Sequence, residues 1–174
     1  MNNLENSGLG DYMYELWAVG CSVDLVIVGH SAGAALAELF AMYIRKNQLW
    51  QREQLYVYSF GTPRVGDSMF SAKLFNSVMA PFRILYMNDT ISQYPPTSVD
   101  RTQPPNINQT GDSYMHYGYT ILYTSYRNNR GKITAKSTKC ANGEDPACDD
   151  QGSDINQHYA YFNYKEQDYD SMTC

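Results

Sequence analysis

Ser31 is the residue with the clearest potential for chemistry. It lies in the segment Gly29-His30-Ser31-Ala32-Gly33, which satisfies the pattern G-x-S-x-G of a nucleophilic serine on a sharp turn between a strand and a helix. Such a turn needs small residues at Gly29 and Gly33, because the backbone approaches closely there. The backbone N–H of Ala32 then lies at a helix N-terminus, where it can stabilise an oxyanion. The alternative is that Ser31 only caps the helix.

A nucleophilic serine needs a base, and the chain has only 3 histidines. His30 adjoins the serine and points away from it on a sharp turn, which favours a packing or supporting role. His116 lies in or beside an expected strand and is interpreted as structural. His158 follows all the expected strands, which suits the order serine, acid, histidine of α/β hydrolases. We therefore predict that His158 is the base.

An acid is needed to orient the histidine, and Asp89 is the best candidate. It comes directly after the apolar segment RILYM, at the carboxyl end of an expected strand, where catalytic groups collect. Asp67 is better explained as a helix cap. Asp100 and Asp112 are alternatives, but they lie in a polar loop where solvated carboxylates are common.

An apolar strand and a helix must flank Ser31 to hold it on such a turn. The segment Asp24 to Val28, DLVIV, is an almost unbroken apolar run, which predicts a central strand of a parallel sheet covered on both faces. The segment Ala32 to about Asn47 is rich in helix formers and ends with a basic pair, which predicts a helix. One side of that helix carries Ala35, Leu39, Met42 and Lys46.

The rest of the chain continues the alternation of strands and helices. Strands are predicted at Leu55 to Phe60, at Arg83 to Met87 and within Tyr114 to Tyr126, and a helix is predicted after Asp67. The segment Asn128 to Asp154 reads as a polar loop. This alternation predicts an α/β fold with a mostly parallel sheet, in which the loops at the carboxyl ends of the strands carry the chemistry.

Composition excludes several classes of function. The net charge of −5 and the scattered Lys and Arg residues provide no basic patch for nucleic acid. No apolar stretch approaches the roughly 18 residues of a transmembrane helix, and the first residues do not read as a signal peptide. The 4 cysteines lack metal-site spacing, so disulfides are the better interpretation. Cys140 and Cys148 flank a short polar loop that a disulfide would close.

With these residues in view, the sequence resembles the class 3 lipases, the fungal-type triacylglycerol lipases of the α/β hydrolase fold. VGHSAGAALAEL is similar to the family's GHSLGGALA segment, and YSFGTPRVGD is similar to its FGxPRVGN segment. RILYMNDTISQYPP resembles the segment that carries the family's acid, and NQHYAYF resembles the HLxYF segment of its histidine. Four ordered segments therefore carry the resemblance.

The resemblance implies a role for each candidate residue. It implies Ser31 as the nucleophile, Asp89 as the acid, His158 as the base and the Ala32 N–H as an oxyanion donor. His116 falls in a segment that resembles the family's non-catalytic histidine segment. No metal and no cofactor are expected.

The resemblance also bears on the domain, which we expect to comprise residues 1–174 as one lipase-like α/β hydrolase domain. The family has well over a hundred residues before the turn that carries its nucleophilic serine, whereas 28 precede Gly29 here. We therefore expect the C-terminal part of a lipase, without the N-terminal strands, the lid and the loop of the second oxyanion donor. The strand before Ser31 would then lie at a sheet edge, with unpaired backbone and exposed apolar surface. Cys21 or Cys174 would have lost a partner.

The expected function is that of a serine ester hydrolase that cleaves carboxylic esters of lipids, at a lipid–water interface, through an acyl-enzyme. The expected partners are a lipid ester, with no nucleic acid and no transmembrane segment. Two alternatives stay open: a catalytically inactive lipase fragment that acts as a binding remnant, and a phospholipase A1 or feruloyl-type esterase. An extracellular location is implied by the family and the cysteines.

Overall fold

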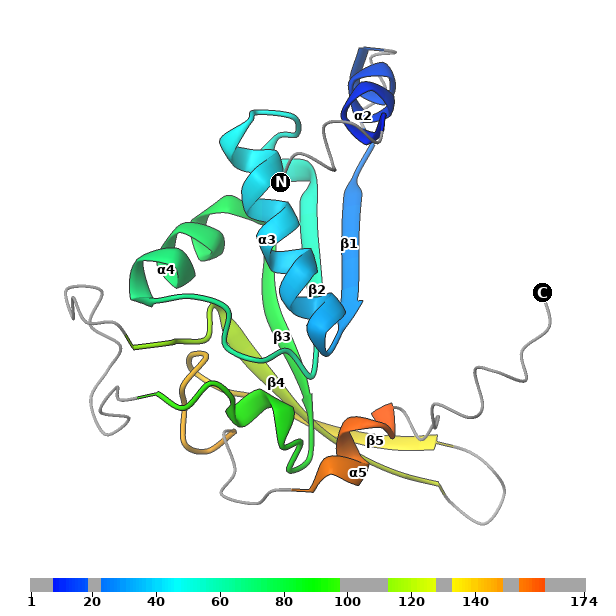
Figure 1. Ribbon diagram of the computed structural model, residues 1–174. Coiled ribbons are helices and arrows are strands. Elements are labelled where there is room, and N and C mark those ends of the chain that lie inside the picture. The colour runs from blue at the N-terminus through cyan, green and yellow to red at the C-terminus, as the bar shows by residue number, and fades with distance from the viewer. Residues whose placement is uncertain (1–7, 19–22, 98–112, 128–132, 149–153, 162–174) are drawn as a thin grey trace.

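The computed structural model describes residues 8–18, 23–97, 113–127, 133–148 and 154–161, which form a 5-stranded sheet and its helices (Figure 1). The strands are β1 (Leu25–His30), β2 (Leu55–Phe60), β3 (Ala80–Tyr86), β4 (Tyr119–Arg127) and β5 (Ile133–Lys139). The helices are α2 (Leu9–Ala18), α3 (Ala32–Lys46), α4 (Ser68–Ser77) and α5 (Ile155–His158), with 3-10 turns η1 (Arg52–Gln54) and η2 (Ile91–Gln93). Helix α2 was not expected from the sequence.

The sheet has the strand order β1-β2-β3-β4-β5, with the first four strands parallel and β5 antiparallel to β4. The predicted α/β fold with a mostly parallel sheet is therefore confirmed. Because each right-handed crossover moves one strand further in the same direction, the crossover helices fall on one face. Figure 1 shows α3 and α4 side by side on that face. The carboxyl ends of β1, β2 and β3 consequently meet at one edge, beside α5.

Two groups of buried side chains hold these layers together. The first lies between the sheet and the helices and includes Ile44, Leu55, Val57 and Leu74. The second joins Tyr86, Tyr123 and Tyr161, with Phe60 packed against it. Val57 and Phe60 point to opposite faces of β2, because side chains alternate along a strand. The second group therefore lies on the other face of the sheet, at its carboxyl end.

Helix α3 buries a side that the sequence did not single out. Its fully buried residues are Ala34, Ala37, Glu38, Ala41 and Ile44. The small alanines let the helix lie close to β1 and β2, which it contacts. Leu39, on the side described above, is 45% exposed. That side is turned away from the sheet and lies next to α4.

Strand β1 differs from the expected strand covered on both faces. Its residues alternate between half-buried and exposed, and Val26 and Val28 are 50% and 61% exposed. Among the described strands β1 lies at the edge of the sheet and pairs only with β2. This position agrees with the expectation that the strand before Ser31 forms a sheet edge. The face of β1 that carries Val26 and Val28 is exposed because α3 packs on the opposite face.

The segment Asn128 to Asp154 is not the continuous polar loop that we expected. It contains β5, which is antiparallel to β4 from Arg127 opposite Ile133 to Ile121 opposite Lys139. Backbone pairing explains how so polar a segment forms a strand at the sheet edge. The expected disulfide between Cys140 and Cys148 is confirmed, with their Cα atoms 6.0 Å apart. Cys21 and Cys174 lie outside the described residues.

No helix in the described part of the chain has the length and apolar character that crossing a bilayer requires.

Candidate active site

Ser31 lies on a sharp turn between β1 and α3. Its φ of 57° is in the left-handed region, which costs a non-glycine residue of the order of 1 to 3 kcal/mol. Its backbone N–H donates to the Phe60 carbonyl at 3.0 Å, and its own carbonyl accepts from Ala34 N–H. The Ser31 side chain makes no capping hydrogen bond to α3. The alternative that Ser31 is only a helix cap is therefore not supported by the geometry.

The two glycines of the turn have different reasons to be there. A Cβ on Gly29 would lie 2.3 Å from the Gly33 carbonyl oxygen, so only glycine fits at Gly29. A Cβ on Gly33 would meet no atom of the described residues within 4 Å, since Gly33 is exposed on the first turn of α3. The expected need for a small residue therefore applies to Gly29, whereas at Gly33 it is the backbone that makes the close contact. Ala32 is the first residue of α3, and N–H groups of a first turn have no acceptor within the helix.

His158 joins Ser31 to Asp89. Its Nε2 lies 2.8 Å from Ser31 Oγ, and its Nδ1 lies 2.9 and 3.0 Å from the two Asp89 carboxylate oxygens. His158 is 2% exposed and Asp89 is 0% exposed. With the ring proton on Nδ1, the imidazole donates to the carboxylate and can accept the Ser31 hydroxyl proton at Nε2. Three residues predicted from separate sequence segments thus meet in one hydrogen-bonded chain.

Local contacts bring His158 to this position. The Asp154 carboxylate caps α5 by accepting from Asn156 N–H at 2.9 Å. Asp154 N–H donates to the Asn88 carbonyl at 3.0 Å, which ties the start of α5 to the segment of Asp89. The Gln157 side chain accepts from Asn88 N–H. The segment of the base and the segment of the acid are therefore held together by their backbones as well as by the two side chains.

Sequence reasoning missed two residues that contact the acid. Tyr161 OH donates to Asp89 Oδ2 at 2.7 Å and accepts from Tyr86 N–H at 3.2 Å. Burial, followed by the nearby Asp89 carboxylate, raises the pKa of Tyr161 well above its usual value, so it stays a neutral donor. Gly61 has φ 54°, and a Cβ there would lie 2.5 Å from Asp89 Oδ2. The spacing H-x-x-Y from His158 is a signal for Tyr161 in the sequence.

The other two histidines have the supporting roles that we predicted. The His30 ring stacks on the His158 ring with 4.5 Å between centroids, and its Nε2 lies 3.0 Å from the His158 carbonyl. His116 is 4% exposed, and its Nε2 lies 2.8 Å from the Ser92 carbonyl. His30 therefore packs against the candidate base, and His116 holds the segment that follows Asp89.

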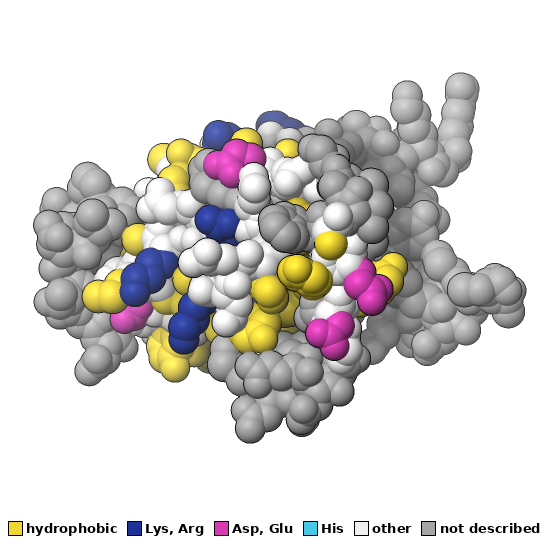
Figure 2. Space-filling view, turned by 90° about the horizontal axis from the view of Figure 1, so that it is seen from above, with side chains coloured by type: hydrophobic (Ala, Val, Ile, Leu, Met, Phe, Trp, Pro, Cys, Tyr) yellow, Lys and Arg dark blue, Asp and Glu magenta, His cyan; other side chains and the backbone are white. Residues whose placement is uncertain are grey.

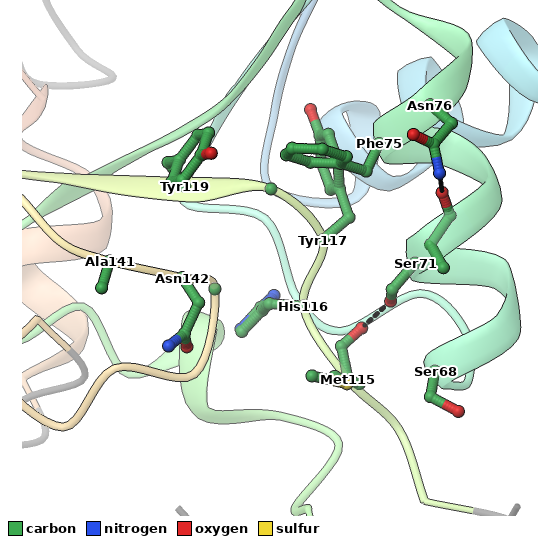
Figure 3. A pocket seen from close by; sticks show the side chains of 13 residues that line it. Ser68, Ser71, Phe75, Asn76, Met115, His116, Tyr117, Tyr119, Ala141 and Asn142 are labelled. Carbon is green, nitrogen blue, oxygen red and sulfur yellow. Dashed lines mark hydrogen bonds between the residues drawn. The ribbon is translucent and has the colours of Figure 1, made fainter. Parts of the chain in front are cut away.

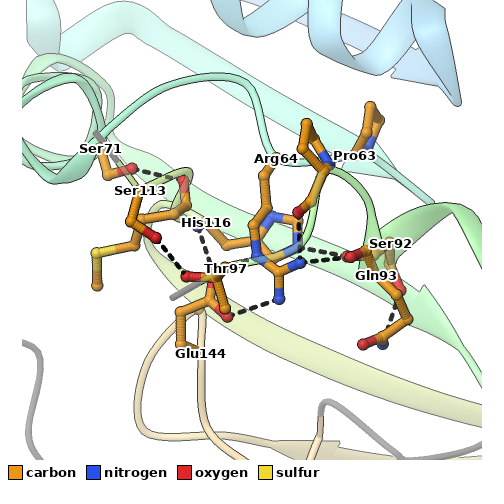
Figure 4. A network of polar contacts seen from close by, with 12 residues as sticks. Pro63, Arg64, Ser71, Ser92, Gln93, Thr97, Ser113, His116 and Glu144 are labelled. Atoms are coloured by element: carbon orange, nitrogen blue, oxygen red, sulfur yellow. Dashed lines mark hydrogen bonds and ion pairs between the residues drawn. The ribbon is translucent and has the colours of Figure 1, made fainter. Parts of the chain in front are cut away.

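A buried ion pair anchors the same segment (Figure 4). The Arg64 guanidinium donates through Nε and Nη2 to the two Glu144 carboxylate oxygens, both at 2.8 Å. Its Nη1 donates to the carbonyls of Gln93 and Pro95, which follow Asp89 in the chain. Glu144 also accepts from His116 N–H at 2.7 Å. Arg64 and Glu144 thus join the disulfide-closed loop to the segment of the acid.

The structure describes one of the three alternative acids. Asp67 caps α4 as predicted, since its Oδ1 accepts from Phe70 N–H at 2.7 Å. Asp100 and Asp112 lie outside the described residues. Asp89 Oδ1 accepts from Ile91 N–H at 2.8 Å, and Oδ2 accepts from Tyr161 OH. Each carboxylate oxygen therefore has a donor in addition to His158.

A cavity of about 390 Å³ lies elsewhere, between α4, the start of β4 and the disulfide-closed loop (Figure 3). Figure 3 shows Phe75, Tyr117 and Tyr119 at one end and His116 and Asn142 nearby. Its lining includes neither Ser31 nor Asp89 nor His158. Geometry of the hydrogen-bonded side chains, and not cavity size, therefore identifies the candidate site.

Comparison with known proteins gives consistent matches. The family model described as Lipase (class 3) matches residues 5–99. The lipase ZK262.3 of Caenorhabditis elegans is 30% identical over 169 residues, which are 87% of this chain and 47% of that protein. The triacylglycerol lipase OBL1 of Arabidopsis thaliana is 33% identical over 109 residues, 59% of this chain and 19% of that protein.

A crystal structure of lipase from Rhizopus microsporus var. chinensis is similar in fold, with a TM-score of 0.71 at 21% identity. The match covers 96% of this chain and 53% of that one. At this identity the likeness concerns the fold alone. The chain spans about half the length of the nematode protein and of the Rhizopus protein.

Proposed function

The chain belongs to the class 3 lipase family, and on that premise we propose that it carries the catalytic residues of a serine hydrolase that cleaves carboxylic esters of lipids. The observation that supports this most is the hydrogen-bonded chain Ser31–His158–Asp89, with 2.8 Å between Ser31 Oγ and His158 Nε2. A hydroxyl is a weak nucleophile at neutral pH, and a base at this distance with an acid behind it removes that limitation.

In the proposed reaction, Ser31 Oγ attacks the ester carbonyl carbon while His158 Nε2 takes the hydroxyl proton. Asp89 stabilises the imidazolium that forms, and the Ala32 N–H donates to the oxyanion of the tetrahedral intermediate. Collapse of this intermediate breaks the carbonyl–alkoxy bond, and His158 gives its proton to the leaving alcohol. Water then attacks the acyl group on Ser31 with His158 again as the base, and a fatty acid is released.

The positive φ of Ser31 supports this role. The strained turn keeps the Ser31 hydroxyl at the carboxyl end of β1 and directs it to His158 and away from the backbone of α3. A serine that served only as a cap would have no reason for this backbone conformation, because an N-cap residue adopts extended angles.

The test is covalent labelling with a fluorophosphonate, which phosphonylates an activated serine. The wild-type chain is expected to be labelled, Ser31→Ala to be unlabelled, and Ser77→Ala on α4 to be labelled like wild type. Hydrolysis of triacylglycerol and of phospholipid, compared in the same samples, identifies the preferred lipid class. Equal labelling of wild type and Ser31→Ala contradicts the nucleophile. Absence of label from all three proteins favours the alternative of an inactive fragment that only binds.

We also propose an extracellular location, supported by the disulfide Cys140–Cys148. Disulfides persist in oxidising compartments and are rare in the cytosol. Expression of the complete gene product in its native cells, followed by assay of medium and lysate, is expected to find the protein in the medium. Recovery from the lysate alone contradicts this location.

A further inference from the structure

A groove lies between α3 and α4, and Ser31 is not among the residues that line it. It is an open groove of about 910 Å³. Its lining from α3 is Leu39, Met42, Tyr43, Arg45 and Lys46, and its lining from α4 is Met69, Phe70, Ala72, Lys73, Asn76 and Ser77. Sites for small molecules commonly have volumes of roughly 300 to 1,000 Å³ and mostly apolar walls with a few polar groups. We call this feature the α3–α4 groove.

Much of the lining of the α3–α4 groove is apolar. Leu39 is 45% exposed and Met69 is 56% exposed, and Met42 and Phe70 are half-buried beside them. Leu39, Met42 and Lys46 share the side of α3 that the sequence pattern singled out and that the sheet does not bury. Unbranched methionine side chains adapt readily to flexible alkyl groups. The apolar part of the lining therefore suits a hydrocarbon chain.

The charged residues that line the groove are all cationic. Arg45, Lys46 and Lys73 line it, and no acidic residue does. The Arg45 guanidinium donates to the Trp50 carbonyl, whereas Lys46 and Lys73 form no ion pair within the described residues. Figure 2, which views the molecule from above, shows on its left half Lys and Arg side chains directly beside hydrophobic ones. In a chain of net charge −5 this local excess of positive charge is not explained by composition.

We propose that the α3–α4 groove binds one long-chain carboxylate. The alkyl chain lies along Leu39, Met42, Met69 and Phe70, and the carboxylate meets the ammonium groups of Lys46 and Lys73. The volume of the groove and the two ammonium groups that line it suit one alkyl chain with one carboxylate. The inference rests on the proposed function in one respect: ester hydrolysis would release such a carboxylate.

The groove is separate from the candidate active site. Ser31 precedes the first residue of α3, and Lys46 is the last residue of this 15-residue helix, which at 1.5 Å per residue spans about 22 Å. A carboxylate in the groove therefore does not occupy the position of an acyl group on Ser31. We infer a product site, not a part of the acyl pocket.

The test is calorimetric titration of the 174-residue chain with dodecanoate below its micelle concentration. Saturable binding at one site per chain is expected. The double variant Lys46→Glu with Lys73→Glu is expected to weaken it at least tenfold, and Leu39→Asp to weaken it similarly. Lys136→Glu on β5, which makes one of the same charge changes outside the groove, is expected to leave it unchanged. The milder pair Lys46→Gln with Lys73→Gln, checked by circular dichroism, guards against loss of fold and is also expected to weaken binding.

Two further arms separate this inference from the proposed function. Dodecanoate binding is expected to persist in Ser31→Ala and in fluorophosphonate-labelled protein, and loss of binding there overturns the groove site. Wild-type affinity in the Lys46/Lys73 variants also overturns it, even where Ser31 is labelled and ester is hydrolysed. Conversely, groove binding without any labelling of Ser31 contradicts only the proposed function. Binding to phosphatidylglycerol vesicles without saturable dodecanoate binding overturns the single-chain site in favour of a surface contact.

Discussion

Two buried carboxylates illustrate, at the scale of the residue, how differently the fold treats the same chemical group. Asp89 is 0% exposed and accepts hydrogen bonds from Ile91 N–H and Tyr161 OH while it faces the His158 ring. Glu38 is 3% exposed, and its Oε1 accepts no hydrogen bond within the described residues. Burial disfavours the charged form of a carboxylate, and at Glu38 this effect outweighs the opposing contributions of Ser59, Arg83 and Thr62. Both Asp89 oxygens therefore accept hydrogen bonds, whereas Glu38 Oε1 accepts none within the described residues.

Tyr161 is expected to act on catalysis through Asp89. Tyr161→Phe removes a hydrogen bond to Asp89, and hydrogen bonds to charged groups are typically worth about 1.5 to 3 kcal/mol. If about half of the larger figure acts on the transition state, kcat falls about tenfold, with KM little changed. Ester hydrolysis measured over a range of substrate concentrations gives both constants. Tyr58→Phe is the matched control, since the Tyr58 hydroxyl makes no hydrogen bond within the described residues. A similar kcat in wild type and Tyr161→Phe would contradict the positioning role.

Glu38 is expected to make stability depend on pH. Burial raises the pKa of Glu38 from 4.5 to about 8, and the nearby Ser59, Arg83 and Thr62 oppose this only in part. The pKa of Glu38 is higher in the folded protein than in the unfolded chain. The contribution of neutral Glu38 to the stability of the fold is therefore fully present below pH 4.5 and is lost as the pH rises to about 8. The slope is about 1.4 kcal/mol of unfolding free energy per pH unit across that window.

Glu38→Gln keeps a neutral side chain of the same shape and is therefore expected to flatten this dependence and to be more stable than wild type at pH 8. Urea unfolding at several pH values between 5 and 8 measures the free energy of unfolding of both proteins. The exposed Glu53→Gln serves as the control. A difference between wild type and Glu38→Gln that stays constant over this range would show that Glu38 does not titrate as described.

At the scale of the elements, the acid segment after β3 is held from two sides. Arg64, which follows β2, donates to the carbonyls of Gln93 and Pro95, and His116, before β4, contacts the Ser92 carbonyl. Both meet Glu144 in the loop that Cys140 and Cys148 close. The disulfide therefore fixes the position of a carboxylate that orders the residues around Asp89.

Glu144→Gln is expected to leave the Arg64 guanidinium, which is 0% exposed, without its countercharge. Removal of one partner of a buried ion pair typically costs about 3 to 5 kcal/mol, so the free energy of unfolding should fall by an amount of this order. The acid segment should also become looser and kcat should fall. Denaturant unfolding and ester hydrolysis measure the two effects, with the exposed Glu15→Gln as control. Unchanged stability would contradict the anchoring role.

At the scale of the whole molecule, the described part of the sheet ends at β1. Right-handed crossovers in one direction place α3 and α4 on the same face, and β1 ends the described sheet with Val26 and Val28 exposed. An edge strand with exposed apolar side chains offers both unpaired backbone and hydrophobic surface to another chain. The described residues therefore predict self-association of the 174-residue chain.

Replacement of these valines by lysines is expected to reduce that association. Val26→Lys with Val28→Lys adds charge to the edge strand without burying it, because both side chains are already half exposed or more. Light scattering at increasing protein concentration should give a smaller mean mass than for wild type. Met79→Lys, at a residue that is 42% exposed outside β1, is the control. Equal association of all three proteins would locate the contact elsewhere.

The parts of the fold that depend on local pattern were predictable. Ser31 on its turn, helix α3, strand β2 and the Asp67 cap follow from propensity, apolar periodicity and turn chemistry, which act within a few residues. Asp89 and His158 could also be predicted as candidates from the sequence, because chain order and the position of Asp89 after a strand constrain the choice. The strand β5 was missed because its polar residues form it by pairing with β4, a contact that no local pattern records.

The sequence alone predicts the type of candidate site, because the turn at Ser31 and the chain order of serine, acid and histidine depend on short segments. The packing of the layers brings His158 Nε2 to 2.8 Å from Ser31 Oγ and places Tyr161 and Gly61 beside Asp89. It also decides that Arg64 meets Glu144 and that one side of α3 faces α4 to form a groove. These features join residues far apart in the chain, so they depend on how the layers pack and not on local propensity.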